Sequence, residues 1–233
     1  MSQEKLNILK EDNHILVAVK APGQLAQGDK SGDASIHKEL KNYIKEKYKK
    51  PGEAYLGLVH RLDRPVGGLM IFARTSKAAR RLSRQFQLGE TEKIYLAWVE
   101  GSAPNKKILR HKIGRRGKKA IIQGDGQEAI LTFSCLYRHE KHSLLLIQLE
   151  TGRHHQIRLQ LSAEGFPILG DKLYGIGESW KKGQIALYAF ALTFLHPTIK
   201  EKQEYRHLPP AFWNIPSQIR HLLKNAPLAQ ILN

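Results

Sequence analysis

The stretch from Leu58 to Ala73 reads LVHRLDRPVGGLMIFA and joins an unusual arrangement of charges to an apolar run. Asp63 stands between Arg61 and Arg64, a Pro-Val-Gly-Gly turn follows, and Leu69–Ala73 is wholly apolar. A short apolar run bounded by turn residues predicts a buried strand. A carboxylate held between two arginines just ahead of such a strand is our candidate for the residue that performs chemistry.

Composition favours a single compact unit that meets an anionic partner. With 233 residues the chain can bury a substantial core, and we expect one catalytic domain over residues 1–233. Its 38 lysines and arginines outnumber 21 acidic residues, for a net charge of +17. Nucleic acid is the first partner that this charge predicts, and an acidic membrane surface is the alternative.

Other features of the sequence concern location and oligomeric state. No apolar run approaches the roughly 20 residues that span a bilayer. The start, Met1–Lys10, lacks the pattern of an export signal. Cys135 is the only cysteine, which excludes an internal disulfide and a multi-thiolate metal site. We therefore expect a cytoplasmic protein without membrane association, with Cys135 as a small core residue. We also expect a monomer, although no motif of the sequence determines the oligomeric state.

Local patterns in the first half predict a hairpin and two helices. Apolar runs on both sides of a polar turn indicate a hairpin over 6–20, and an ordered loop follows Gly23. Helical spacing of apolar residues predicts helices over 35–49 and 76–88. The second is expected to begin at a cap, Thr75 or Ser76, and to end at Gly89.

One face of the second helix is wholly basic. A face with four cations and no acid is more than solubility requires, so we interpret it as a phosphate-binding face, with a merely solvated surface as the alternative. Its cations are Lys77, Arg80, Arg81 and Arg84.

A second basic segment lies between predicted strands. Lys93–Gly101 has a strong strand pattern, and Lys106–Lys119 then contains eight lysines and arginines, Arg115 and Arg116 among them, and no acid. Glycines at 114 and 117 accompany these cations. The pattern predicts a mobile basic hairpin that grips a nucleic-acid backbone.

The remaining segments suggest further strands and one helix. Strand patterns cover 129–137 and 143–150, a helix is expected to open near Thr151 as its cap, and 167–175 is rich in turn residues. Residues 185–194 are helical or extended. Without a regular βαβ rhythm, the chain is predicted to be α+β, with a largely antiparallel mixed sheet and flanking helices.

Five motifs, taken in order, resemble those of the RluA-type RNA pseudouridine synthases. The resemblance runs from about Ile8 to Pro209, and five motifs in the right order are hard to obtain by chance. The motifs are HRLD at 60–63, FARTSKA at 72–78, KIYLA at 93–97, TGRHHQIR at 151–158 and PILGDKLYG at 167–175.

The resemblance implies the pseudouridine synthase catalytic fold and the isomerisation of uridine to pseudouridine in structured RNA, ribosomal or transfer RNA, without a cofactor. Asp63 would be the nucleophile, and Arg153 the cation that keeps it ionised. Tyr95 would stack on the extracted uracil and take the C5 proton. Arg61 would fill the gap left by the everted base.

The cations expected to contact RNA come from all of these segments. Arg158 and its neighbour Gln156 have a second possible role, which is to fix the loop that carries Arg153. The expected RNA-binding residues are Arg61, Arg64, Lys77, Arg80, Arg81, Arg84, Arg115, Arg116 and Arg158.

The chain departs from the family pattern in two ways. Val66-Gly67-Gly68 replaces the usual Thr-Ser-Gly, which bears on the turn and on RNA preference rather than on the reaction. Many relatives also carry a small basic RNA-binding domain ahead of the catalytic one. With about seven residues before the first motif, we expect no separate N-terminal domain here.

Several residues have simpler interpretations. His154-His155 could suggest a metal, but adjacent side chains on a helix diverge by about 100°, so we predict no metal site. Asp171 is interpreted as a buried turn-former rather than as a second catalytic acid. For His60 local packing is an equal alternative, and for Tyr95 an ordinary core aromatic is the alternative.

Two other functional classes are alternatives to an RNA pseudouridine synthase. A non-catalytic RNA-binding or assembly protein could keep the same fold and basic surface, but it would have no reason to keep Asp63, Arg153 and Tyr95 together. A hydrolase finds no support, because the sequence has neither a Gly-x-Ser-x-Gly elbow nor a suitably spaced pair of acids.

Overall fold

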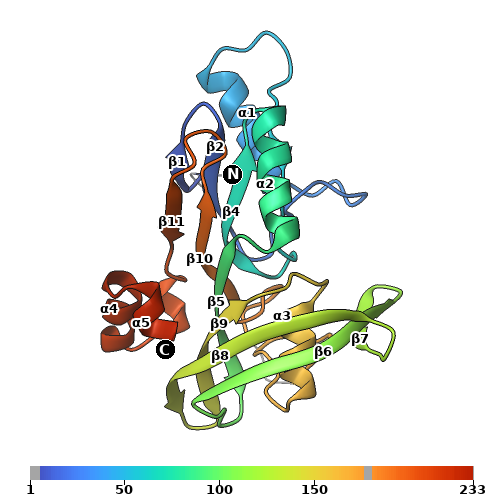
Figure 1. The fold of residues 1–233 in the computed structure, drawn as a ribbon, viewed down its shortest axis with the longest axis vertical. Coiled ribbons are helices and arrows are strands. Elements are labelled where there is room, and N and C mark those ends of the chain that lie inside the picture. Colours follow the sequence, from blue (N-terminus) through green and yellow to red (C-terminus); the bar gives the residue numbers. More distant parts are fainter. Residues whose placement is uncertain (1–5, 176–179, 233) are drawn as a thin grey trace. The chain divides into compact units, whose positions relative to one another are not determined.

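The computed structural model describes residues 6–175 and 180–232, which separate into two compact units (Figure 1). The first unit comprises Met1–Thr91 and Leu192–His207, and the second comprises Glu92–Ala191 and Leu208–Asn233. Strand β10 (Leu187–Leu195) begins in the second unit and ends in the first. Each unit has its own strands, helices and buried side chains.

The first unit is built on the strand order β1-β2-β4-β10, with β3 paired to β4 and β11 paired to β10. The pairs of β2 with β1 and of β4 with β2 and β3 are antiparallel. Its other elements are β1 (Ile8–Glu11), β2 (Ile15–Lys20), α1 (Ile36–Lys47), β3 (Gly57–Leu58), β4 (Gly67–Ala73), α2 (Ser76–Leu88) and β11 (Lys202–Arg206).

Strand β4, the predicted apolar run, is buried along its whole length. Side chains alternate between the two faces of a strand. Ile71 belongs to a cluster that includes Leu82 of α2, and Phe72 on the opposite face stacks with His37 of α1 at 6.3 Å between ring centroids. A strand covered on both faces reads as a continuous apolar run, which explains the pattern in the sequence.

The predicted hairpin and both predicted helices of this unit are confirmed. The N-cap Ser35 accepts a hydrogen bond from the backbone N–H of Lys38, and Thr75 accepts one from Ala78. Helix α2 ends at Gly89, which has the left-handed backbone (φ 72°) that glycine adopts without strain. Figure 1 shows α2 running alongside β4.

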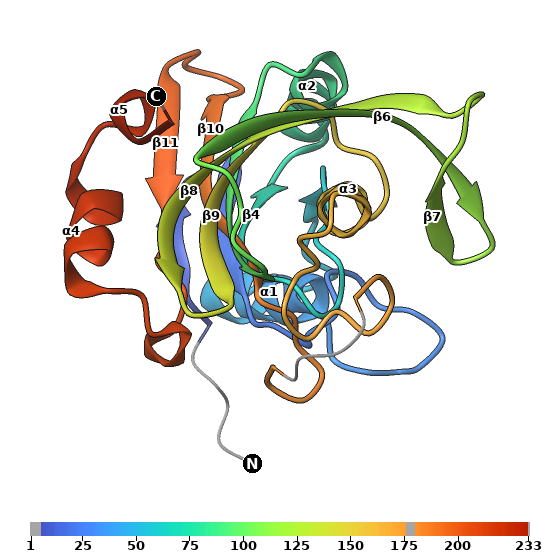
Figure 2. The ribbon, with the colours of Figure 1, turned by 90° about the horizontal axis from the view of Figure 1, so that it is seen from below.

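The second unit is built on the order β10-β5-β9-β8-β6-β7, and the pairs from β5 to β7 are antiparallel. Figure 2 shows α3 on the inner side of the curve formed by β6 and β8. The elements are β5 (Glu92–Glu100), β6 (Lys106–Arg116), β7 (Lys119–Ile122), β8 (Gln127–His139), β9 (His142–Leu149), α3 (Gln156–Ala163), the 3-10 turn η1 (Ala211–Trp213), α4 (Ser217–Asn225) and α5 (Leu228–Leu232).

The predicted helix cap at Thr151 is wrong. Helix α3 begins only at Gln156, and its N-cap position is His155. The Thr151 hydroxyl instead accepts a hydrogen bond from the backbone N–H of Ile130 at 2.8 Å and pairs with the side-chain carbonyl of Gln156 at 2.8 Å. A contact with a distant strand therefore takes the place of the local cap.

Two further predictions for this unit are resolved. The sequence of 185–194 fits either a helix or a strand, and in the structure Leu187–Leu195 form strand β10. Cys135 is half-buried rather than part of the core, and β8 changes register between Cys135 and Tyr137. Its thiol approaches the backbone carbonyl of Tyr137 at 3.5 Å.

The α+β class with a largely antiparallel mixed sheet and flanking helices is confirmed. Within the described residues, none of the helices has both the length and the hydrophobicity needed to traverse a bilayer.

Candidate active site

Asp63 lies half-buried in the loop between β3 and β4 of the first unit. Its backbone carbonyl accepts a hydrogen bond from the N–H of Val66 at 3.0 Å, which closes a turn over 63–66. The predicted turn is thus present, although Gly67 and Gly68 already belong to β4. The departure from the family pattern at Val66-Gly67 therefore falls at the junction between this turn and the central strand.

Lys20, at the end of β2, holds the Asp63 loop from inside the unit. Its side chain is fully buried, and its ammonium donates to the backbone carbonyls of Ala21 at 3.0 Å, Gln24 at 2.7 Å and Arg64 at 3.1 Å. Burial lowers the pKa of Lys20 to about 7, while the nearby Asp63 carboxylate raises it and Arg64 lowers it.

No role was assigned to Lys20 from the sequence. In the sequence, Lys20 stands at the end of an apolar strand and directly before Ala-Pro-Gly. A lysine at such a position is ordinarily exposed, so the sequence did not indicate that its side chain is buried.

The residues beside Asp63 differ in their contacts. Arg61 is exposed. Arg64 donates to the carbonyl of Gly23 at 3.1 Å and forms an ion pair with Asp33 at 2.7 Å, both side chains being about half exposed. His60 accepts a hydrogen bond from the N–H of Ile71 at 3.0 Å. Its ring also stacks on Phe86 at 4.5 Å, which supports local packing for this histidine.

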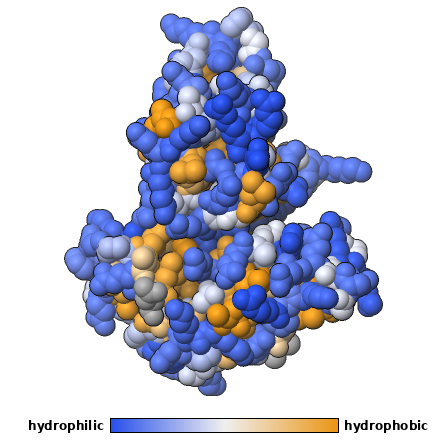
Figure 3. Space-filling view, in the orientation of Figure 1, coloured by the Kyte–Doolittle hydropathy of each residue, from blue (hydrophilic) through white to orange (hydrophobic). Residues whose placement is uncertain are grey.

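The four predicted cations of α2 are all exposed. Arg81 also donates to the carbonyl of Pro197 at 2.6 Å, so its guanidinium is partly fixed. Figure 3 shows the most hydrophilic colour gathered over α2, in agreement with a basic face that a phosphate backbone could reach.

In the second unit, Tyr95 occupies a half-buried position on β5, opposite Ile147 of β9. Lys93, two residues earlier, points to the same face of the strand and is buried. Burial and the charge of Arg153 together lower the pKa of Lys93. The positive charge of Arg153 therefore acts on Lys93, which lies on the same face of β5 as Tyr95.

Arg153 lies in the segment 151–155, here called the Arg153 loop, and is exposed. Its Nε donates to the carbonyl of Glu128 on β8 at 2.9 Å, and its backbone N–H donates to Gln156 Oε1 at 3.0 Å. Gln156 is itself buried, and its amide nitrogen donates to the carbonyl of Ile130 at 3.1 Å. Gln156 thus fixes the loop, which is one of the two roles left open by the sequence.

Arg158 also has a structural role. Its guanidinium is buried and forms two hydrogen bonds with the buried Asp171 carboxylate, at 2.7 and 2.8 Å. Asp171 Oδ1 also accepts from the backbone of Leu173 at 3.0 Å and of Tyr174 at 3.4 Å. Asp171 is therefore the buried turn-former that was predicted, and this geometry favours the structural role of Arg158 over RNA contact.

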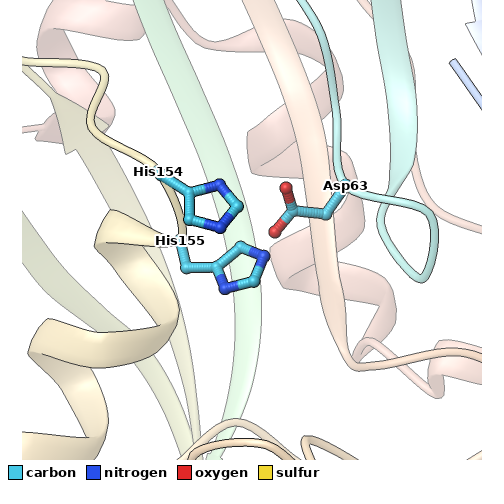
Figure 4. A group of neighbouring side chains, drawn as sticks. All are labelled: Asp63, His154 and His155. Atoms are coloured by element: carbon cyan, nitrogen blue, oxygen red, sulfur yellow. The ribbon is translucent and has the colours of Figure 1, made fainter. Parts of the chain in front are cut away.

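His154 and His155 depart from the geometry assumed for them. Their rings stack on each other (Figure 4), and the ring centroids are 3.7 Å apart. The expected divergence of about 100° applies within a helix. Both residues precede the first residue of α3, and His155 has a left-handed backbone (φ 52°).

The basic segment forms the predicted hairpin. We call residues 106–122, which make up β6, β7 and the turn between them, the basic arm. Arg116 pairs with Lys119 across the turn, and Gly117 in that turn has a positive φ of 59°. Arg115, Arg116, Lys118 and Lys119 are all exposed.

Asp63 belongs to the first unit and Tyr95 and Arg153 to the second. The ion pair between Asp63 and Arg153 therefore stays a prediction, as do the roles of the other predicted site residues.

An α+β chain with a half-buried acid on a fixed loop, a basic helix face and a basic arm has the features of an enzyme that acts on nucleic acid. Residues 14–163 match the family model described as RNA pseudouridylate synthase. These residues make up more than half of the chain, which belongs to this family, and the RluA-type resemblance is confirmed.

Individual relatives agree with this assignment. The chain is 35% identical over 212 residues to "Uncharacterized RNA pseudouridine synthase" of Aquifex aeolicus, covering 83% of this chain and 66% of the relative. It is 33% identical over 218 residues to "Ribosomal large subunit pseudouridine synthase D" of Xanthomonas campestris, covering 84% and 63%. The chain thus spans slightly less than two thirds of the length of these relatives.

A solved structure shares the fold. "Human RNA Pseudouridylate Synthase Domain Containing 4" superposes with a TM-score of 0.75 at 22% identity and covers 89% of this chain and 90% of that chain.

Proposed function

We propose that the protein isomerises uridine to pseudouridine in structured RNA, with the Asp63 carboxylate as the nucleophile. The observation that carries the proposal is the HRLD motif at 60–63, whose aspartate lies on a loop held by the buried ammonium of Lys20. Family membership supports the reaction class, and the fixed loop supports a role for Asp63 that needs a defined position.

The reaction needs a group that can attack and later leave. Asp63 attacks C1′ or C6 of the target uridine, the N1–C1′ bond breaks, the uracil turns so that C5 bonds to C1′, and the bond to Asp63 breaks to restore the carboxylate. The C5 proton is removed and N1 gains a proton, so that substrate and product are isomers. No group is imported, and the proposed reaction needs no cofactor.

Two residues of the second unit complete the proposed mechanism. Arg153 pairs with Asp63 and keeps the carboxylate ionised when water is excluded. Tyr95 offers a half-buried aromatic ring for stacking and a hydroxyl for the C5 proton. Arg61, which is exposed two residues before Asp63, fills the space left by the everted base.

The basic arm and the basic face of α2 bind the RNA backbone. Their exposed cations suit phosphate contacts, which supply sequence-independent affinity. We infer ribosomal RNA as the substrate, because a relative carries the name of a large-subunit ribosomal enzyme, and transfer RNA as the alternative. The protein is proposed to act as a monomer in the cytoplasm.

A pseudouridine map tests the proposal. Ribosomal and transfer RNA from cells with and without the gene are compared, and the gene is then returned as wild type or as Asp63→Asn. We expect at least one site to vanish without the gene, to return with wild type and to stay absent with Asp63→Asn. An unchanged map in cells that express the gene would instead favour a non-catalytic RNA-binding protein.

A further inference from the structure

Tyr174 follows the turn at Asp171 and lies under the basic arm. Its ring packs against a cluster formed by Ile113 of β6, Ala120 of β7 and Ala129 of β8. The Asp171 carboxylate accepts from the backbone N–H of Tyr174 at 3.4 Å. These contacts give the ring a fixed place within the second unit.

Two more groups hold the same residue. The Arg158 guanidinium lies over the Tyr174 ring at 5.3 Å, and the Ser162 hydroxyl donates to the Tyr174 carbonyl. Arg158 is in turn fixed by its two hydrogen bonds to Asp171. A side chain supported in this way on both its ring and its backbone can position other groups.

The hydroxyl of Tyr174 joins two segments that are distant in sequence. It accepts a hydrogen bond from the backbone N–H of Ala120, on β7 of the basic arm, at 2.7 Å. It also lies 2.9 Å from Nδ1 of His155 in the Arg153 loop. Because the oxygen accepts from Ala120, the single hydroxyl proton can be donated to Nδ1 when His155 carries its own proton on Nε2.

A second contact also connects the Arg153 loop with the basic arm. His154 Nε2 lies 3.3 Å from the carbonyl of Lys118 in the turn of the arm, and a carbonyl can only accept, so this nitrogen donates. The rings of His154 and His155 stack on each other. The left-handed backbone of His155 is unfavourable for most residues other than glycine and asparagine, and the contacts of its ring with Tyr174 and His154 stabilise it.

We propose that Tyr174 is a positioning residue that joins the basic arm to the Arg153 loop, so that RNA bound by the arm meets Arg153 in one fixed arrangement. The inference rests on the proposed function, because it gives Arg153 a part in the reaction. Tyr174 acts through the loop and the arm and does not itself contact the reacting atoms.

The test compares Tyr174→Phe with Tyr137→Phe in the same unit. The first change removes the hydroxyl and keeps the ring that packs under the arm. The second removes a hydroxyl from a ring on β8 that packs edge-on against Trp98 at 6.2 Å. For each variant, the dissociation constant for RNA from cells that lack the gene and the single-turnover rate at saturating RNA are measured.

We expect Tyr174→Phe to bind RNA within about threefold of wild type, because every phosphate-binding cation remains. Its single-turnover rate should fall roughly ten- to hundredfold, since a small misplacement of a positioned group is enough for such a loss. Tyr137→Phe should match wild type in both. An unchanged rate in Tyr174→Phe would overturn the inference.

Backbone hydrogen exchange gives a readout that does not depend on turnover. RNA should slow exchange in both the arm and the Arg153 loop of wild type, but only in the arm of Tyr174→Phe. Equal protection of the loop in both proteins would contradict the inference. If wild type converted no uridine, the proposed function would fail, while this exchange comparison would still decide whether Tyr174 joins the two segments.

A second variant covers the case in which Tyr174→Phe does not fold. His155→Asn removes the ring that meets Tyr174, and asparagine tolerates the left-handed backbone. As for Tyr174→Phe, we expect the dissociation constant for RNA to be preserved and the single-turnover rate to fall. A wild-type single-turnover rate in His155→Asn would contradict the inference that Tyr174 connects the arm to the Arg153 loop.

Discussion

The Asp63 loop and the Arg153 loop are held in physically different ways. The first depends on one buried ammonium, that of Lys20, which binds three backbone carbonyls. The second depends on neutral groups, chiefly the Gln156 amide and the Tyr174 hydroxyl. In the Asp63 loop, one side chain makes the hydrogen bonds that hold the loop and also makes its stability depend on pH. In the Arg153 loop, several neutral side chains share the hydrogen bonds that hold the loop.

The largest effect in this comparison is expected from Lys20→Met. The change leaves three carbonyls without their donor inside the first unit and should lower the free energy of unfolding by about 2–4 kcal/mol. Urea denaturation measures the loss, with Lys50→Met, at an exposed position, as the matched control. A loss no larger than that of the control would show that Lys20 does not carry the support of the Asp63 loop.

A smaller effect is expected from Gln156→Leu. The leucine keeps most of the buried volume but removes the bonds to the backbone of Arg153 and Ile130. We expect a loss of about 1–2 kcal/mol in the free energy of unfolding, less than for Lys20→Met, because the other contacts of the loop remain. The exposed Gln87→Leu is the control, and a loss exceeding that of Lys20→Met would reverse the comparison.

The smallest effect, when it is counted for one pH unit, is a dependence of stability on pH. Because burial lowers the pKa of Lys20 from 10.5 to about 7, the unfolded chain binds one more proton than the folded chain between these values. The stability contributed by Lys20 should therefore rise with pH through that window. The difference in unfolding free energy between wild type and Lys20→Met should widen by up to about 1 kcal/mol per pH unit above pH 7. A difference that stays constant or narrows would contradict the lowered pKa.

Elements set by local patterns were predictable from the sequence. The cap Thr75, the C-terminal Gly89 and the apolar run of β4 act over a few residues, and the structure has them where they were expected. The hairpin of the basic arm was predictable for the same reason.

Features set by distant contacts were not predictable. Thr151 resembles a helix cap, but its hydroxyl accepts from the backbone N–H of Ile130, which lies on strand β8. Lys20 donates to the carbonyl of Arg64, and the Tyr174 hydroxyl accepts from the backbone N–H of Ala120; in both cases the partner is far away in the sequence. A local pattern cannot encode such partners, because the fold brings them together.

The central claim is that the Asp63 carboxylate performs the chemistry, and its most direct test is tritium release from RNA labelled at uracil C5. The purified protein is given RNA from cells that lack the gene, and Asp63→Asn is compared with Asp125→Asn, the same change at an exposed position. We predict that wild type and Asp125→Asn release tritium at similar rates while Asp63→Asn binds the RNA and releases none. Substantial release by Asp63→Asn would contradict the claim.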